Sequence, residues 1–140
     1  MASTPVSVTL GAAIEAAWTH TPIRVGASAA NAPADGTAFL TVMYVAAREH
    51  QISTGAPGAN RWRTNGGLYI ELAIPAGDAP NDAEAPWMDR LEALRDALRG
   101  KFFGNIETLG ASGPTEDESS DLGAYYVYSI AVEYLADVIG

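Results

Sequence analysis

The most regular hydrophobic pattern of the chain lies in residues 61–103, where a stretch of period two is followed by a stretch of helical period. In the first stretch, alternate positions are apolar: Leu68, Ile70, Leu72 and Ile74. Side chains of an extended strand alternate between its faces, so this pattern predicts a strand with one buried face. After Pro86 the apolar residues recur at helical intervals: Trp87, Leu91, Leu94, Leu98 and Phe102. At about 100° per residue, this spacing predicts an amphipathic helix that begins near residues 82–86 and ends near Gly104.

A second apolar stripe predicts a helix near the N-terminus. Thr4 can cap this helix, and Pro5 suits the first helical position, where a missing N–H costs nothing. One face of the helix then carries Leu10, Ala13, Ile14, Ala17 and Trp18. Pro22 ends the helix, because proline cannot continue it. Residues 23–36 form a connection rich in alanine and turn formers, in which residues 23–25 are a candidate short strand.

Residues 37–48 predict a strand that is apolar on both faces. One face carries Phe39, Met43 and Val45, and the other carries Leu40, Val42 and Tyr44. Both faces therefore need cover. Residues 53–60 are a polar connection, after which the next strand returns antiparallel, so we predict a long hairpin with a glycine bulge. The alternative is a tight turn at Asn65, Gly66 and Gly67 that would make two short strands.

The C-terminal third predicts two more strands, at residues 106–109 and 124–135, separated by an exposed acidic loop at residues 113–121. The last strand has a tyrosine-rich face that we expect to be buried, consisting of Tyr126, Tyr128, Ile130, Val132 and Tyr134. Its other face carries Tyr125, Val127, Ser129, Ala131 and Glu133. The order α-β-β-α-β-β predicts an α+β fold in which a mostly antiparallel sheet packs against two helices.

The composition narrows the classes of protein. A chain of 140 residues has the size of one domain, so we predict a single domain over residues 1–140. The absence of cysteine excludes disulfides, thiol nucleophiles and iron–sulfur clusters. A net charge of −9 disfavours a nonspecific grip on DNA phosphates. The sequence offers neither an apolar stretch of the roughly 18 residues that a membrane span needs nor a basic leader, so we expect a cytoplasmic chain without membrane contact.

Candidate metal ligands are few. The two histidines, His20 and His50, fall at the ends of predicted elements, where solvated polar residues are common. An acidic run lies at Glu116, Asp117, Glu118 and Asp121. Carboxylates bind hard cations such as Ca²⁺, but this run lacks the EF-hand spacing, so we interpret it as a solvated loop. The sequence therefore predicts no metal site.

Candidate catalytic and nucleic-acid-binding groups are equally sparse. Glu71 and Glu133 could face each other as a general acid and base, although outward-pointing surface carboxylates are the simpler interpretation. Arg61 and Arg63 flank Trp62, and we expect them to form salt bridges to a neighbouring subunit or to the Glu116 loop. Phosphate-binding loops and nucleophile elbows do not occur in the sequence. We therefore predict no catalytic residue, no cofactor and no enzymatic activity.

The order of residues 61–103 resembles the tail terminator family of long-tailed bacteriophages. This order consists of Arg61-Trp62-Arg63-Thr64-Asn65-Gly66-Gly67, the alternating strand, Ile74-Pro75-Ala76-Gly77, an acidic loop, and a helix ending Leu98-Arg99-Gly100-Lys101-Phe102-Phe103. The resemblance extends from about residue 18 to about residue 134, and includes residues 18–23 and 36–45. Residues 53–60 and 113–121 depart from it.

This resemblance implies a virion structural protein of the tail or neck. Such proteins form a closed ring, commonly a hexamer, that caps the tail tube and joins it to the head-tail connector, in phages and in gene transfer agents. The implied partners are copies of the same chain, the tail tube protein and the connector protein. DNA would pass through the lumen without specific binding, and assembly would occur in the host cytoplasm. We expect residues 53–60 and 113–121 to be mobile in the free subunit and ordered on assembly.

Two other classes of protein remain open. One is a different virion neck or tail tube subunit, which would give stacked or open assemblies. The other is a small-ligand-binding or enzymatic α+β domain, which would need a pocket with converging polar groups.

Overall fold

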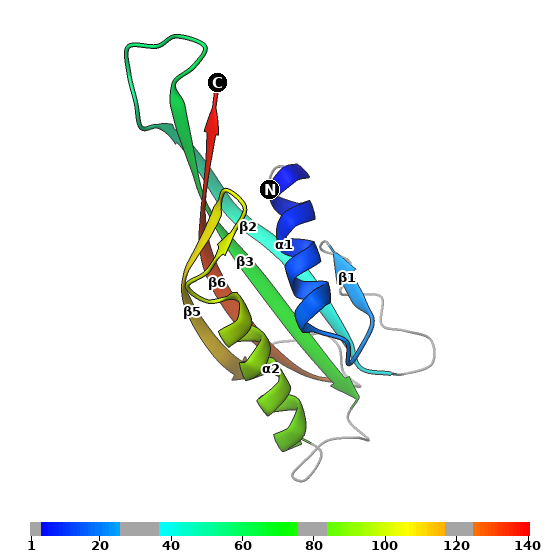
Figure 1. The fold of residues 1–140 in the computed structure, drawn as a ribbon. Helices are drawn as coiled ribbons and strands as arrows, with labels where there is room; N and C mark the ends of the chain where they lie inside the picture. The colour runs from blue at the N-terminus through cyan, green and yellow to red at the C-terminus, as the bar shows by residue number, and fades with distance from the viewer. Residues whose placement is uncertain (1–3, 26–36, 76–83, 117–124) are drawn as a thin grey trace.

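The computed structural model describes residues 4–25, 37–75, 84–116 and 125–140. The elements in these ranges are α1 (Thr4–Ala17), β1 (Ile23–Val25), β2 (Phe39–Gln51), β3 (Arg61–Pro75), α2 (Glu84–Leu98), β4 (Phe102–Phe103), β5 (Ile106–Glu116) and β6 (Tyr125–Ile139). Figure 1 shows α1 and α2 on the same side of one long sheet. The predicted α+β class is therefore confirmed. Neither of these two helices is both long and apolar enough to cross a membrane.

The strands of the described residues form one six-stranded sheet in the order β1-β2-β3-β6-β5-β4. All neighbours pair antiparallel except β1, which runs parallel to β2. The short strands β1 and β4 were not part of the predicted order, although residues 23–25 were a candidate strand. They extend the order to α-β-β-β-α-β-β-β. A strand of two or three residues is too short to show an alternating hydrophobic pattern, so neither the strand nor its pairing partner can be predicted from the sequence.

The predicted long hairpin of β2 and β3 is confirmed, and residues 52–60 connect its strands. The alternative tight turn is wrong, because Asn65, Gly66 and Gly67 lie within the continuous strand β3. The bulge lies on β2 rather than at the glycines. Val45 pairs with Gly67 and Arg48 pairs with Asn65, so two residues of β2 oppose the single Gly66. The bulge thereby places Val45 and Arg48 on the same face of the sheet.

The main hydrophobic core lies between the helices and the sheet. From the helices it contains Ile14, Trp18, Leu91, Leu94 and Leu98, and from the strands Leu40, Val42, Leu68, Ile70, Leu72, Ile74, Tyr128, Ile130 and Val132. Trp87 packs against this core while partly buried. The alternating face of β3 and most of the apolar face of α2 are therefore as predicted. In α1, Leu10 joins a smaller cluster with Val6 and Tyr134, whereas Ala17 is exposed, contrary to the predicted stripe.

The end of α2 differs from the prediction. The helix ends at Leu98, and Gly100 has a φ of +62°, the left-handed conformation that commonly ends a helix. The buried hydroxyl of Thr108 donates to the carbonyl of Leu98 and accepts a hydrogen bond of 2.8 Å from the N–H of Lys101. These bonds turn the chain into β4. Phe102 therefore leaves the helix face and is 75% exposed.

The C-terminal strands are longer than predicted. β5 continues to Glu116, so residues 113–116 are strand rather than loop, and the rest of the predicted acidic loop lies outside the described residues. Bulges after Thr108 and Ser112 break the alternation of β5, which hid this strand from the pattern. On β6 the tyrosine face is buried except for Tyr126, which is 37% exposed. The opposite face of the sheet is also buried at one end, where Val127 of β6 packs with Phe39 and Ala73. On the same face, Val45 of β2 is 46% exposed.

Candidate functional site

The structure places the described candidate residues far apart or singly. His20 packs beside Trp18 with ring centroids 5.0 Å apart, while His50 lies on the exposed part of β2. Glu71 and Glu133 pair with Ser129 and Gly67, respectively. These two rows are four residues apart along the strands, which is about 13 Å, so the carboxylates are not an acid–base pair.

The predicted acidic run is only partly described. Glu116 is the last residue of β5, while Asp117, Glu118 and Asp121 lie outside the described residues. In the part of the chain that the structure describes, no group of three or more His, Cys, Asp or Glu side chains is placed to hold a metal ion.

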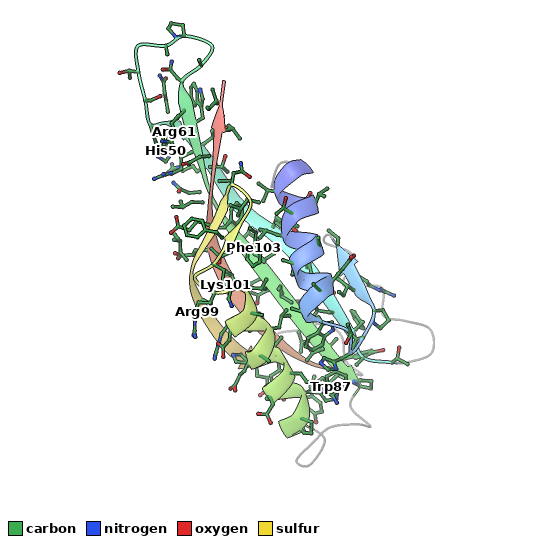
Figure 2. The ribbon with its side chains drawn as sticks, viewed as in Figure 1. His50, Arg61, Trp87, Arg99, Lys101 and Phe103 are labelled. Atoms are coloured by element: carbon green, nitrogen blue, oxygen red, sulfur yellow. The ribbon has the colours of Figure 1, made fainter. Side chains whose placement is uncertain are left out.

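One end of the sheet extends past both helices, and we call it the arm (Figure 1). It consists of residues 48–65 of the hairpin and residues 136–140 at the end of the chain. Figure 2 shows His50 and Arg61 on the arm and Trp87 at the opposite end of the molecule. The arm carries three of the exposed large apolar side chains: Ile52, Val138 and Ile139.

Asp137 of β6 forms ion pairs with two arginines of β3 in the arm. Its carboxylate accepts hydrogen bonds from Nε of Arg63 at 2.8 Å and from Nη2 of Arg63 at 3.0 Å. Arg61 donates to the same carboxylate at 3.1 Å. The hydrogen bond from Arg63 lowers the pKa of Asp137, against the opposing effect of burial, and raises the pKa of Arg63. The predicted salt bridge to the Glu116 loop is wrong, because β3 and β6 run side by side and place Asp137 next to both arginines. The alternative partner, a neighbouring subunit, stays a prediction.

The C-terminal strand is fastened to the hairpin by two more contacts. The indole N–H of Trp62 donates to the carbonyl of Gly140 at 3.1 Å, and the N–H of Gly140 donates to the carbonyl of Asn60 at 2.9 Å. The arm is therefore a three-stranded unit rather than a lone hairpin.

Replacing Asp137 with alanine is expected to lower the melting temperature by a few degrees at neutral pH. The pKa of Asp137 in the folded protein lies below its ordinary value of 3.8, so the carboxylate stabilises the fold above that pH and this contribution is lost as the pH falls through the lowered pKa. Thermal unfolding of both proteins from pH 7 to pH 2 should therefore show curves that converge in acid. Glu92→Ala, on the exposed face of α2, is the control. Curves that stay parallel down to pH 2 would exclude the proposed role of Asp137.

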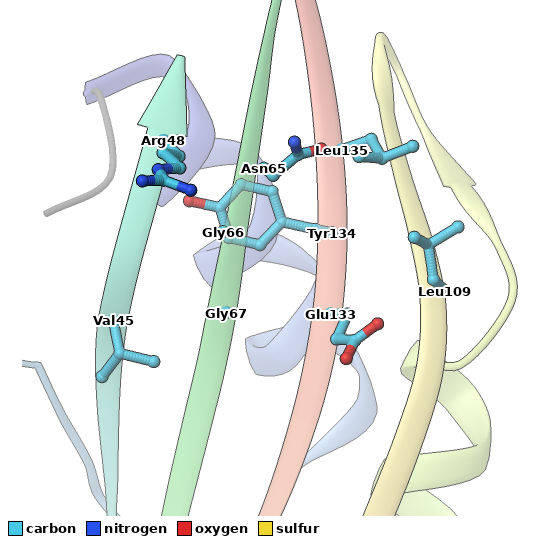
Figure 3. A pocket seen from close by; sticks show the side chains of 9 residues that line it. All are labelled: Val45, Arg48, Asn65, Gly66, Gly67, Leu109, Glu133, Tyr134 and Leu135. Atoms are coloured by element: carbon cyan, nitrogen blue, oxygen red, sulfur yellow. The ribbon is translucent and has the colours of Figure 1, made fainter. Parts of the chain in front are cut away.

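The face of the sheet opposite the helices is hollowed by what we call the trough. Two adjacent hollows of about 410 Å³ and about 310 Å³ share Val45, Gly67 and Glu133. Their other lining residues are Arg48, Asn65, Gly66, Leu68, Tyr69, Leu109, Gly110, Ala111, Ser112, Ala131, Val132, Tyr134 and Leu135. Figure 3 shows the larger hollow, with Val45 and Arg48 on β2 at one side and Leu109 on β5 at the other.

The lining of the trough carries little charge. Among its described lining residues only Arg48 and Glu133 are charged. Its uncharged polar lining residues are Asn65, Tyr69, Ser112 and Tyr134. Sequence reasoning missed the trough, because the bulge on β2 and the order β2-β3-β6-β5 bring its residues together. The glycine pair at positions 66 and 67 was the one local signal of it.

The fold is shared with solved structures of low sequence identity. One solved protein, whose name gives no function, has a TM-score of 0.53 and 16% identity, and the match covers 94% of this chain and 89% of that chain. Another is the sheath/tube terminator of an extracellular contractile injection system, PVC, in its extended state, with a TM-score of 0.52 and 14% identity. That match covers 99% of this chain and 57% of the terminator, so this chain spans little more than half of that protein. The predicted resemblance to terminators is confirmed at the level of the fold.

A chain from the virion of a native gene transfer agent particle is also similar, with a TM-score of 0.40, 15% identity, and coverage of 99% of this chain and 87% of that chain. This score is too low to support an argument. No protein-family model matches the sequence, and no curated protein sequence matches it.

Proposed function

We propose that this protein is a tail terminator: a virion structural protein that forms a closed ring, a hexamer, on the end of a tail tube and joins the tube to the head-tail connector. The observation that carries this proposal is the fold shared with a sheath/tube terminator over 99% of this chain. The partners of the ring are copies of the same chain, the tube protein and the connector. Assembly takes place in the host cytoplasm, and the ring remains in the tail or neck of the particle.

The surface of the subunit supports assembly. The eight exposed large apolar residues of the described chain are Val8, Val25, Val45, Ile52, Phe102, Tyr126, Val138 and Ile139. Val8 lies on the helix side and Val45 on the trough side, so apolar surface is exposed on two opposite sides of the subunit. Different surfaces on opposite sides give head-to-tail contacts, and such contacts stop growing only when the rotation closes a ring.

The charge of the chain supports a passive conduit for DNA. At a net charge of −9 the ring repels the phosphates of a passing duplex, so the wall holds the polymer weakly and transit is unhindered. The protein performs no chemistry in this role and uses no cofactor. A small-ligand-binding domain is the alternative, and the trough would be its site.

Deleting the gene is expected to leave filled heads that are not joined to tails, together with tails of irregular length. Without the ring, tube growth has no stop and the connector has no surface to bind, whereas genome packaging does not depend on the tail. Electron microscopy of particles from the deletion strain, and from the same strain complemented with the gene, measures both features.

Normal joined particles from the deletion strain would contradict the terminator function. A purified protein that polymerises into open tubes would instead favour the tube-subunit alternative.

A further inference from the structure

The outward face of α1 is apolar, which is unusual for a helix on the surface of a small domain. Val8 is 65% exposed, and Ala12 and Ala16 are exposed beside it. Glu15 is the only charged residue of the helix. By contrast, α2 carries six charged residues between Glu84 and Leu98. Nothing in the described part of the chain covers the outward face of α1.

The trough has matching properties. Its lining includes Gly66, Gly67, Gly110, Ala111 and Ala131, small residues that allow another backbone to approach closely. Arg48 stands at its β2 side, is exposed, and has no ion-pair partner among the described residues. Glu133 stands on β6, two strands away. The trough therefore offers an apolar floor with a positive group at one side and a negative group further across.

We propose that the outward face of α1 packs into the trough of a second copy of this chain, with Glu15 paired to Arg48 of that copy. The inference rests on the proposed function, because it assigns one interface of the proposed ring. The occupant follows from charge: the single charged side chain on the α1 face is negative, and the unpaired charged side chain at the β2 side of the trough is positive.

The dimensions agree with this arrangement. Val8 and Glu15 are seven residues apart, which is about 10 Å along a helix. Arg48 lies in the row of Asn65 and Glu133 in the row of Gly67, so two strand spacings and two residues along the strands separate them, a distance of about 12 Å. A helix that crosses the strands with Glu15 at Arg48 therefore brings Val8 and Ser7, where its first turn ends, toward Glu133. The first turn of a helix carries partial positive charge, so this end is also complementary.

The contact is head-to-tail, because α1 and the trough lie on opposite faces of the same sheet. Each subunit can therefore bind one copy on each side. Repetition of the contact closes a ring when the rotation per subunit divides the circle.

A charge swap tests the pairing. Glu15→Arg and Arg48→Glu are each expected to weaken self-association by about tenfold, because each places like charges together, and the double variant is expected to restore it. Sedimentation velocity and native mass spectrometry measure the association of the full chain. Glu92→Arg, which makes the same charge change on the exposed face of α2, is the matched control and should associate as the wild type does. All three substituted positions are exposed, and circular dichroism checks that each variant is folded.

Cross-linking tests the placement independently of charge. The chain has no cysteine, so a Val8→Cys protein mixed with a Ser112→Cys protein forms a mixed disulfide only if α1 of one copy reaches the trough of another. The expected product is a covalent dimer on non-reducing gels. A mixture of Glu92→Cys with Ser112→Cys is the control and should give little of it.

Two results would overturn the inference, and they differ in what they say of the ring. Rings that form equally well with Glu15→Arg and with Glu92→Arg, and no Val8–Ser112 disulfide, exclude this interface while leaving the ring in place. A wild-type chain that stays monomeric both alone and with the tail tube protein excludes the interface and the proposed function together.

Discussion

Leu94→Asp is expected to unfold the protein. Leu94 is 1% exposed and lies in the main core with Leu91 and Leu98, where its side chain faces the sheet. An aspartate there would be a buried carboxylate without a partner, which costs several kcal/mol. Since domains of this size are stable by about 5 to 15 kcal/mol in total, such a loss removes most or all of the folded population. Circular dichroism with urea titration measures the free energy of unfolding.

The matched control is Ala93→Asp at the next position of the same helix. Residue 93 is exposed, so an aspartate there adds the same charge and has the same helix propensity, but its carboxylate stays in solvent. We expect a change below about 1 kcal/mol for this variant. A soluble Leu94→Asp protein with an unchanged melting temperature would show that this face of α2 does not pack on the sheet.

Gly66→Ala is expected to destabilise the protein by about 3 kcal/mol. Gly66 pairs with Tyr134 across β3 and β6, and the tyrosine ring lies over the glycine. A Cβ at position 66 would come within 2.4 Å of Cζ of Tyr134. The ring has little room to move away, because Tyr134 is 1% exposed and packs with Val6, Leu10 and Ile106. Chemical denaturation measures the effect.

Three further variants separate this clash from a general effect of alanine in a strand. Gly110→Ala is the control, because a Cβ there meets no atom within 4 Å, and its stability should change by less than about 1 kcal/mol. Tyr134→Ala should remove the clash, so that the two substitutions together cost less than the sum of each alone. Tyr134→Phe keeps the ring and should not rescue Gly66→Ala. Additive effects of Gly66→Ala and Tyr134→Ala would contradict the contact.

The tyrosine hydroxyl also lies against Gly66, where a Cβ would come within 2.4 Å of it. It is buried, and among the described residues it has no hydrogen-bond partner. Burial raises the pKa of Tyr134. The ring is therefore held by its shape against Gly66.

The repeating parts of the fold were predictable from the sequence, because hydrophobic period reports which face of an element is buried. Leu68, Ile70 and Leu72 on β3 and Leu91 and Leu94 on α2 are buried as their spacing predicts. A regular element exposes this signal in consecutive residues, so no knowledge of its neighbours is needed. The hairpin of β2 and β3 was predictable for the same reason, with turn-forming residues marking its loop.

The ends of elements and the candidate site depended on contacts between distant residues, which a local pattern does not contain. The spacing of Phe102 continues the apolar face of α2, but Gly100 and the Thr108 hydroxyl end the helix four residues earlier. The partner of Arg63 is Asp137, which lies 74 positions away and becomes its neighbour only when β3 pairs with β6. The trough likewise exists because β2, β3, β6 and β5 lie side by side, an order that the local sequence pattern does not predict. The sequence by itself determined which residues are buried within each element, since burial follows the local period, and the tertiary structure decided which elements meet and so where a partner can bind.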